Sequence, residues 1–577
     1  MNEPTARISE RNLVRDLVES LEAHLGDPCD PDTVISFERI LDLDEREAYP
    51  HLFLDALHAW GAHDYAIPAT WGGRAINLET SLHLVRQVAR RDSTAATALS
   101  ISSLSYMPVW VAGTEEQRVH YGSIVSNGGK ISWGLSERDH GSDLLANEMS
   151  ATRVPGGYLV SGEKWLIGNA TLASHVVLFV RTAARGPAAF TLLVLDKRSL
   201  PAGQVQHLPG ERLHGLRGID MSGVRLSKAF VPETSVIGKE GMGLEVAMKA
   251  SHAVRCLIVG IPLGCADTAL RLALDFATER HIFGRRLCEI PFSRRQLVDA
   301  YAEMVLADCL ASTSARALQV VPSQSSLHSA ASKYLVPTLL GGTMSDLALV
   351  LGARHYLRTD SRFGAFQKLL RDAPVAAFAD GNTVVNLRVL ASQLPTVLAD
   401  REPTPVQRLE VLFNYEATMP GFQPWHMELA SRGGAHDVMD GLEECIDTLT
   451  AEGMSGLAEA GRMVAAEVDL LRERLTASLA RKPREVSGDP DVLDLTHQFC
   501  LLHAAVCVLG TWTHNDPVPP EAVAVWAIRR ALLPLGRHVN CPPEVEQTAA
   551  EHLLDLHARG TSFSVREQQL SWSKGAS

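Results

Sequence analysis

Two polar stretches decide how this chain is interpreted: Trp133-Gly-Leu-Ser-Glu-Arg-Asp-His-Gly-Ser-Asp143 and Gly162-Glu-Lys-Trp-Leu-Ile-Gly-Asn-Ala170. Strand-like apolar runs flank the second stretch at residues 158–161 and 175–180, so both stretches are expected to be loops of a β-domain. Their hydroxyls and exposed backbone N–H groups suit a ligand rich in acceptor atoms, such as a flavin ring or a pyrophosphate. Neither stretch is a metal or nucleophile motif. A plain polar turn between strands is the alternative interpretation.

The composition predicts a folded protein with several packed units. A chain of 577 residues is long for a single core, and 46% hydrophobic residues exclude a mostly disordered chain. With 54 basic and 67 acidic residues the net charge is −13, which argues against a general nucleic-acid role. Basic groups that recognise an anionic substrate must therefore be local.

Cysteine usage and hydropathy indicate the compartment. The nine cysteines are odd in number and scattered, with no Cys-x-x-Cys pair, which predicts reduced thiols in a cytoplasm and no metal site. Residues 1–32 mix both charge signs and lack an apolar stretch, so no secretory signal is expected. The most apolar later run, residues 499–512, is broken by His503 and is expected to be too short to span a bilayer. We therefore expect a soluble, cytoplasmic protein.

Periodicity predicts a mostly helical fold with a central β-domain. Apolar residues recur at helical spacing before and after a region of short alternating runs. Gly113-Thr-Glu-Glu-Gln117 has the form of a helix start with Thr114 as N-cap. Pro403-Thr-Pro405 reads as a break, and residues 453–480 form a long amphipathic pattern beyond it. The expected segments are a helical domain (1–129), a β-domain (130–237), a second helical domain (238–400) and a C-terminal helical extension (401–577).

The two opening stretches resemble the flavin loops of the acyl-CoA dehydrogenase and acyl-CoA oxidase superfamily, in the order and spacing typical of that family. Their usual forms, roughly L-T-E-P-G-A-G-S-D and K-x-W-I-T-N-G, stand here as residues 135–143 and 164–170. The resemblance implies a flavoprotein that binds FAD. The cofactor-binding residues that it implies in these stretches are Trp133, Leu135, Ser136, Ser142, Leu166, Ile167 and Gly168.

Three later segments extend the resemblance. Gly215-Leu-Arg-Gly-Ile-Asp220 is similar to the family's G-M-R-G-S-D turn, and Arg280-His-Ile-Phe-Gly284 to its E-R-x-x-F-G segment. The latter implies that Arg280, Ile282 and Phe283 reach the FAD of a neighbouring subunit, and hence a homodimer or homotetramer. Leu349-Val-Leu-Gly352-Ala353 stands where the family has Q-x-x-G-G, and Gly352 is carried over as a cofactor contact.

The family's catalytic base is a Glu in E-G-T, nine residues after the Arg of R-D-A. Here Arg371-Asp-Ala373 is followed at that spacing by Asp380-Gly-Asn-Thr383, so the resemblance makes Asp380 the base, with Asn382 beside FAD. Some members place the base directly before an Arg, but that position is Val254 here. The substrate-binding residues implied are Ser142, His252, Arg255 and Gly381.

Removing the α-proton of an acyl thioester requires a carboxylate beside the thioester carbonyl, while the β-hydrogen leaves as a hydride to the flavin. The expected activity is therefore α,β-dehydrogenation of an acyl-CoA or acyl-carrier-protein thioester to the 2-enoyl thioester. An electron-transfer flavoprotein or oxygen would accept the electrons. Chain length and branching of the acyl group are not predicted.

Several family residues are replaced around the expected flavin site. Gly168 stands for a Thr whose hydroxyl faces flavin N5, Leu166 for a Trp that covers the ring, and Leu349 for a Gln; Asn382 and Val384 follow the base in place of Thr and Gln. Two alternatives follow from these departures. One is an oxidase or flavin monooxygenase of the same fold that uses oxygen, and the other is a flavin-free, non-catalytic paralogue acting as a binding subunit.

Overall fold

The computed structural model describes residues 13–399, 408–481, 487–516 and 518–572. The predicted boundary at residues 400–401 and the break at 403–405 lie outside this range. Six helices come first: α1 (Leu13–Leu25), α2 (Phe37–Glu45), α3 (His51–Trp60), α4 (Leu78–Arg91), α5 (Ser93–Ala112) and α6 (Glu115–Ser126). Thr114 caps α6 as predicted, because its hydroxyl accepts a hydrogen bond from the Gln117 N–H at 3.2 Å.

A largely antiparallel sheet follows these helices. Its strands are β1 (Ile131–Gly134), β2 (Ser150–Val154), β3 (Gly157–Gly168), β4 (His175–Arg181), β5 (Phe190–Asp196), β6 (Val205–Leu208), β7 (Met221–Pro232) and β8 (Val236–Ile237). They lie in the order β6-β7-β3-β2-β4-β5-β8, with β1 parallel to β4. Alternation along β4 places Val176 and Leu178 in a core inside the sheet domain, and Val177 and Phe179 against the helices.

The second polar stretch is part of a strand, so the expectation of a loop was wrong there. Residues 162–168 continue β3 and pair with β7, with register shifts between Val160 and Gly162 and between Trp165 and Ile167. Leu166 lies at the second shift with φ 54°. The glycines and polar residues of this stretch resemble a turn in sequence. In the structure they form β-bulges, which bend a strand without ending it.

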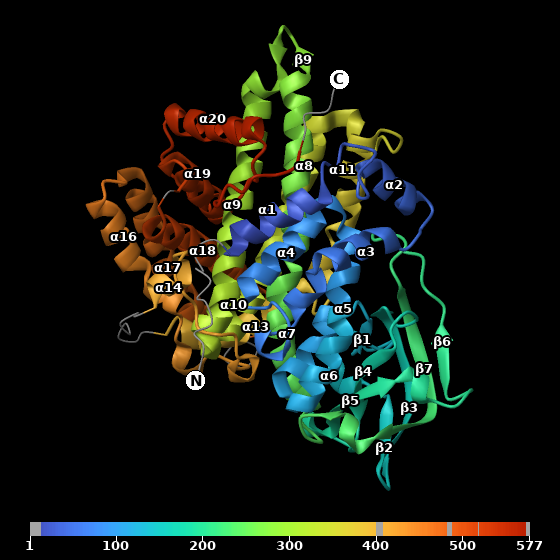
Figure 1. The fold of residues 1–577 in the computed structure, drawn as a ribbon. Helices are drawn as coiled ribbons and strands as arrows, with labels where there is room; N and C mark the ends of the chain where they lie inside the picture. The colour runs from blue at the N-terminus through green and yellow to red at the C-terminus, as the bar shows by residue number, and fades with distance from the viewer. Residues whose placement is uncertain (1–12, 400–407, 482–486, 517, 573–577) are drawn as a thin grey trace, which may run out of the picture.

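The second helical segment contains two long helices that project beyond the rest of the molecule. Between them a short hairpin forms the tip (Figure 1). The elements are α7 (Gly243–Ile258), α8 (Gly260–Glu279), β9 (His281–Ile282), β10 (Arg285–Arg286), α9 (Pro291–Val320), α10 (Ser325–Leu351), α11 (Ser361–Asp372), α12 (Val375–Phe378) and α13 (Thr383–Val397).

The C-terminal extension packs on the helices, on the side away from the sheet (Figure 1). Its helices are α14 (Leu409–Phe413), α15 (Asp437–Asp440), α16 (Leu442–Ala451), α17 (Ser455–Arg481), α18 (Pro490–His514), α19 (Glu521–Leu532) and α20 (Pro543–Arg559). Trp526 of α19 donates to Asp299 of α9 at 2.8 Å. After α20 the chain returns to the N-terminal helices, where the Ser571 N–H donates to Glu22 at 2.8 Å. The extension is therefore built into the core of the fold.

Four helical stretches are long and apolar enough to cross a membrane by length and composition, at residues 93–112, 243–279, 322–356 and 490–514. The expectation that the apolar run around His503 is too short to span a bilayer was wrong, because this run lies in α18, a helix of 25 residues. Between 56% and 100% of the most apolar window of each stretch is buried in the fold.

All nine cysteines are free, and no group of three or more metal-ligating side chains occurs within the described residues.

Candidate functional site

Asp380 lies in the short connection between α12 and α13. Its φ is 53°, in the left-handed region that non-glycine residues rarely adopt, and Gly381 follows with φ 91°. The side chain is half-buried, and this burial raises the pKa of its carboxyl, while the charges of Lys333 and Arg255 act to lower it. The strained turn therefore holds one carboxylate in a weakly solvated place beside two cations.

Both cations are buried and lack a matched carboxylate. Arg255 on α7 is 5% exposed, and a Cβ added to Gly381 would lie 3.5 Å from its Nη2, so its guanidinium lies directly beneath the turn. Burial lowers the pKa of Arg255 to about 10. Lys333 on α10 donates to the carbonyl of Ala376, and burial lowers its pKa to about 8. Among the described residues, the three groups affect one another through their charges, with no side-chain hydrogen bond between them.

His252 lies one turn before Arg255 but is held by α10. Its Nδ1 is 2.9 Å from the hydroxyl of Ser329, and the ring is 3% exposed. Burial lowers its pKa to about 3, with Arg255 adding to the effect. The ring therefore links α7 to α10, and a substrate contact by His252 stays a prediction.

The segment after the base contacts the first polar stretch. Asn382 caps α13 by accepting a hydrogen bond from the Val385 N–H at 2.9 Å, and its Nδ2 donates to the Ser142 hydroxyl at 3.3 Å. Asn386 donates to the carbonyls of Gly381 and Asn382 at 3.1 and 2.9 Å. The structure therefore brings Ser142, Gly381 and Asn382 together with Asp380.

The two polar stretches lie side by side at the end of β1 and β3. The Trp165 N–H donates to the carbonyl of Ser136 at 3.2 Å. Buried Lys164 donates to the Leu135 carbonyl and pairs with Glu137 at 2.8 Å. Burial lowers the pKa of Lys164 to about 8, although Glu137 partly restores it. This ion pair fixes the surface formed by residues 133–136 and 166–168.

The side chains on this surface fit FAD. Leu166 is 38% exposed, and Trp133 and Leu135 are half-buried, whereas Ile167 is buried in the sheet. An apolar face with hydroxyls at Ser136 and Ser142 has the mixed character that an isoalloxazine ring and its ribityl chain require. Ile101 of α5 packs against Gly168, since an added Cβ there would lie 2.5 Å from Ile101 Cδ1. An apolar side chain thus occupies the space of the family's Thr.

The remaining predicted cofactor residues are far from this surface within one subunit. Arg280, Ile282 and Phe283 belong to the hairpin of β9 at one tip of the molecule, whereas β1 and β3 lie toward the opposite end (Figure 1). Phe283 is 96% exposed, and Gly352 is an exposed cap of α10 with φ 58°. These residues do not join the site of their own subunit.

Lys333 and Ile101 were not predicted. Lys333 is the only lysine or arginine in the apolar helix α10, and a lone cation in such a helix was the available signal. Ile101 carried no signal, because nothing in a helical apolar residue indicates that it will cover a glycine of a strand.

A helical domain, a sheet with an apolar and hydroxyl-bearing surface, and a carboxylate on a helix-linking turn suit a flavin-dependent oxidoreductase, and the comparison with known families identifies the class. Models described as the acyl-CoA dehydrogenase N-terminal, middle and C-terminal domains match residues 36–128, 132–229 and 241–394. Together they cover more than half of the chain. The chain therefore belongs to the acyl-CoA dehydrogenase family of FAD-dependent oxidoreductases acting on CH–CH groups.

Individual relatives are distant. The acyl-CoA dehydrogenase of Bacillus subtilis (strain 168) is 25% identical over 360 residues, which cover 61% of this chain and 92% of that protein. Butyryl-CoA dehydrogenase from Megasphaera elsdenii aligns with a TM-score of 0.59 and 21% identity, covering 68% and 100% of the two chains. The prolyl acyl carrier protein oxidase AnaB gives 0.58 and 19%, covering 67% and 99%. At these identities the structural likeness shows the fold.

Proposed function

We propose that the protein oxidises an acyl thioester, carried by CoA or an acyl carrier protein, to the 2-enoyl thioester. The α-carbon loses its proton to Asp380, the β-carbon loses a hydride, and a double bond forms between them. Bound FAD supplies the hydride acceptor. The observation that carries the proposal is the placement of Asp380, a single carboxylate at a strained turn between two buried cations.

The chain's own groups perform three tasks in this reaction. Asp380 receives the proton, and its raised pKa makes it a stronger base than an exposed Asp. Arg255 and Lys333 place positive charge nearby, which favours the ionised carboxylate and opposes the effect of burial on its pKa. In this proposal the thioester lies beside Ser142 and Asn382, which are hydrogen-bonded to each other next to Asp380. Because Asp is about one C–C bond, roughly 1.5 Å, shorter than the family's Glu, the turn must bring its backbone closer to the substrate.

The decisive experiment uses the FAD-loaded protein without oxygen. Acyl-CoA and acyl-carrier thioesters of different chain lengths are screened for bleaching of the flavin absorbance. Asp380→Asn should still bind the best thioester but slow bleaching by about 10²–10⁴-fold. Asp469→Asn, an exposed carboxylate on α17, is the matched control and should be neutral. A wild-type rate in Asp380→Asn would remove the base from the proposal.

A second candidate function is an oxidase or monooxygenase of the same fold. The packing of Ile101 on Gly168 favours it, because the hydroxyl that the family places beside flavin N5 is replaced by an apolar side chain. A neighbour of similar fold is described as an acyl carrier protein oxidase. The rate at which the reduced protein is reoxidised in air, with and without an electron-transfer flavoprotein, separates the two functions.

We also propose a homodimer in which the hairpin of one subunit completes the FAD site of the other. Phe283, Phe292, Leu349 and Tyr356 are 96%, 72%, 69% and 80% exposed, and in this proposal a second copy covers these apolar side chains. Arg280→Ala should weaken FAD binding by about 1.5–3 kcal/mol without unfolding the subunit. Arg198→Ala, which alters a surface pair on the sheet domain, is the control. Unchanged FAD affinity in Arg280→Ala would contradict the shared site.

The free cysteines support a reducing compartment, and on that ground we propose a cytoplasmic location. Fractionation of cells that express the full chain with a tag tests it. Recovery in the membrane fraction after a salt wash would contradict it.

A further inference from the structure

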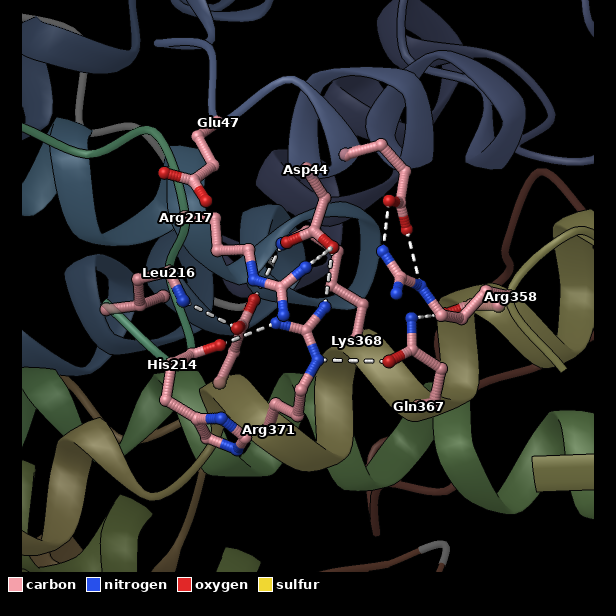
Figure 2. Close-up of polar contacts among 12 residues, drawn as sticks. Asp44, Glu47, His214, Leu216, Arg217, Arg358, Gln367, Lys368 and Arg371 are labelled. Atoms are coloured by element: carbon pink, nitrogen blue, oxygen red, sulfur yellow. Dashed lines mark hydrogen bonds and ion pairs between the residues drawn. The ribbon is translucent and has the colours of Figure 1, made fainter. Parts of the chain in front are cut away.

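Two motifs of the sequence have no chemical role in the proposed reaction, and the structure brings them into contact. They are the turn at residues 214–220 and the Arg371-Asp372 pair at the end of α11. Arg371 Nη1 donates to the carbonyl of His214 at 2.8 Å (Figure 2). The Leu216 N–H donates to Asp372 Oδ1 at 2.6 Å. The turn is thus hydrogen-bonded to Asp372, eight residues before Asp380, and to the neighbouring Arg371.

The same contact is anchored on the N-terminal helices. Arg371 Nη2 donates to Asp44 of α2 at 2.6 Å, and Arg217 lies 3.7 Å from the same carboxylate oxygen (Figure 2). Asp372 also accepts from the Ser93 hydroxyl at 2.5 Å and pairs with Lys368 at 2.6 Å. Because Asp372 is 1% exposed and fully bonded, α11 cannot shift without breaking buried polar contacts.

The other end of the turn holds the flavin strand. The Asp220 carboxylate accepts from the Thr171 and Leu172 N–H groups at 3.0 and 2.9 Å, and its carbonyl accepts from the Asn169 N–H at 2.7 Å. These residues follow Gly168 directly. Leu216, in the middle of the turn, has φ 53°, so the turn keeps a strained backbone between its two sets of contacts.

We propose that residues 214–220 are a positioning element, which sets the distance between the flavin strand and the segment that carries Asp380. The inference rests on the proposed function, because it is the base and the flavin edge that must be held in register. Asp372 and Asp220 are the positioning residues at the two ends. Neither one touches the reacting atoms, and both act through the backbone of the turn.

Gly215 allows a test that leaves every charge in place. A Cβ at this position would lie 2.4 Å from the carbonyl oxygen of Arg371 and 3.0 Å from Asp372 Oδ1, so Gly215→Ala wedges the turn away from α11. Its backbone angles place no strain on alanine. Gly210→Ala is the matched control in the same loop, since the nearest atom to its Cβ would be 3.9 Å away. Should Gly215→Ala fail to fold, Arg371→Lys keeps a cation near Asp44 but loses the bond to His214.

Two measurements follow. In hydrogen exchange of the FAD-loaded protein without substrate, Gly215→Ala should speed exchange by about tenfold in residues 164–172 and also in residues 376–386, while Gly210→Ala should not. At saturating thioester, Gly215→Ala should slow flavin reduction by about 10- to 100-fold with an unchanged half-saturating concentration. Exchange that changes in the turn alone, or a wild-type rate of reduction, overturns the positioning role.

The two proposals fail in different ways. If no thioester bleaches the wild-type flavin, the proposed reaction is wrong, and the exchange measurement alone then decides whether the turn couples the two segments. If thioesters bleach the wild type and Gly215→Ala equally fast, the reaction stands and the positioning role falls.

Discussion

Lys333 and Lys368 are both fully buried lysines of the second helical segment, and their surroundings shift their pKa values in opposite directions. Lys368 donates to Asp92 at 2.7 Å and to Asp372 at 2.6 Å, and these carboxylates outweigh burial and raise its pKa. Among the described residues Lys333 bonds only to a backbone carbonyl, so burial dominates and lowers its pKa to about 8. Burial is the same in the two places, and the number of matched carboxylates differs.

The arginines repeat this difference. Arg86 pairs with Asp267 at 3.2 Å and Asp308 at 2.7 Å, and its pKa is raised. Within the part of the chain that the structure describes, Arg255 has no such partner, and burial lowers its pKa to about 10. Matched pairs join the N-terminal helices to α8 and α9 and serve the fold. Arg255 and Lys333, which have no such pair among the described residues, both act on the carboxyl of Asp380, where a cation of lowered pKa is useful for proton transfer.

The largest expected effect is a loss of stability when Lys368, the lysine with matched carboxylates, is replaced. Lys368→Met leaves two buried carboxylates, Asp92 and Asp372, without their cation, and should lower the free energy of unfolding by about 3–5 kcal/mol. Lys333→Met removes a cation that has no carboxylate in contact and that burial disfavours, so this variant should not lower the free energy of unfolding. Denaturant unfolding of both variants measures the difference. Equal losses would show that the two lysines have the same structural role.

Much of this difference between matched and unmatched cations could not be predicted from the sequence. The alternation of β4 and the cap at Thr114 could be predicted because they depend on neighbours along the chain. The Arg371–Asp44 contact joins residues 327 positions apart, and only the folded chain brings them together. Asp380 was found through the order of motifs, but its two cations come from α7 and α10, whose contact no spacing reveals. Leu166 was assigned to a loop because glycine and polar residues surround it, and these residue types occur both in turns and in β-bulges.

A second prediction concerns catalysis at the unmatched cluster. Lys333 lowers the pKa of Asp380, so Lys333→Met should raise that pKa, and the pH of half-maximal flavin reduction should rise with it because the base must be ionised. Lys333→Arg keeps the charge and should restore the profile. The readout is the rate of anaerobic flavin reduction against pH at saturating thioester. A profile that does not move in Lys333→Met would show that Lys333 acts only through its bond to Ala376.

The smallest expected effect is the pH dependence of the unfolding free energy, to which the two lysines contribute with opposite signs. For Lys333 the folded pKa, about 8, lies below that of the unfolded chain, 10.5. Between these values the unfolded chain holds a proton that the folded protein has lost, so the unfolding free energy rises with pH, by about 1 kcal/mol from pH 8 to 9. Lys164 and Lys197 also have pKa values of about 8 and add the same trend, so the Lys333 share is the difference between wild type and Lys333→Met.

Lys368 should show the reverse. Its folded pKa lies above the unfolded value, so its stabilisation is fully present below pH 10.5 and is lost as the pH rises through the folded pKa. Between pH 8 and 9 the loss of free energy in Lys368→Met should therefore stay constant, whereas Lys333→Met should lose ground against wild type over that interval. Urea unfolding at pH 8.0, 8.5 and 9.0 is sufficient to see this. Parallel curves for wild type and Lys333→Met would mean that Lys333 keeps its proton in the folded protein, and that the cluster around Asp380 is as firmly charged as the pairs that hold the fold.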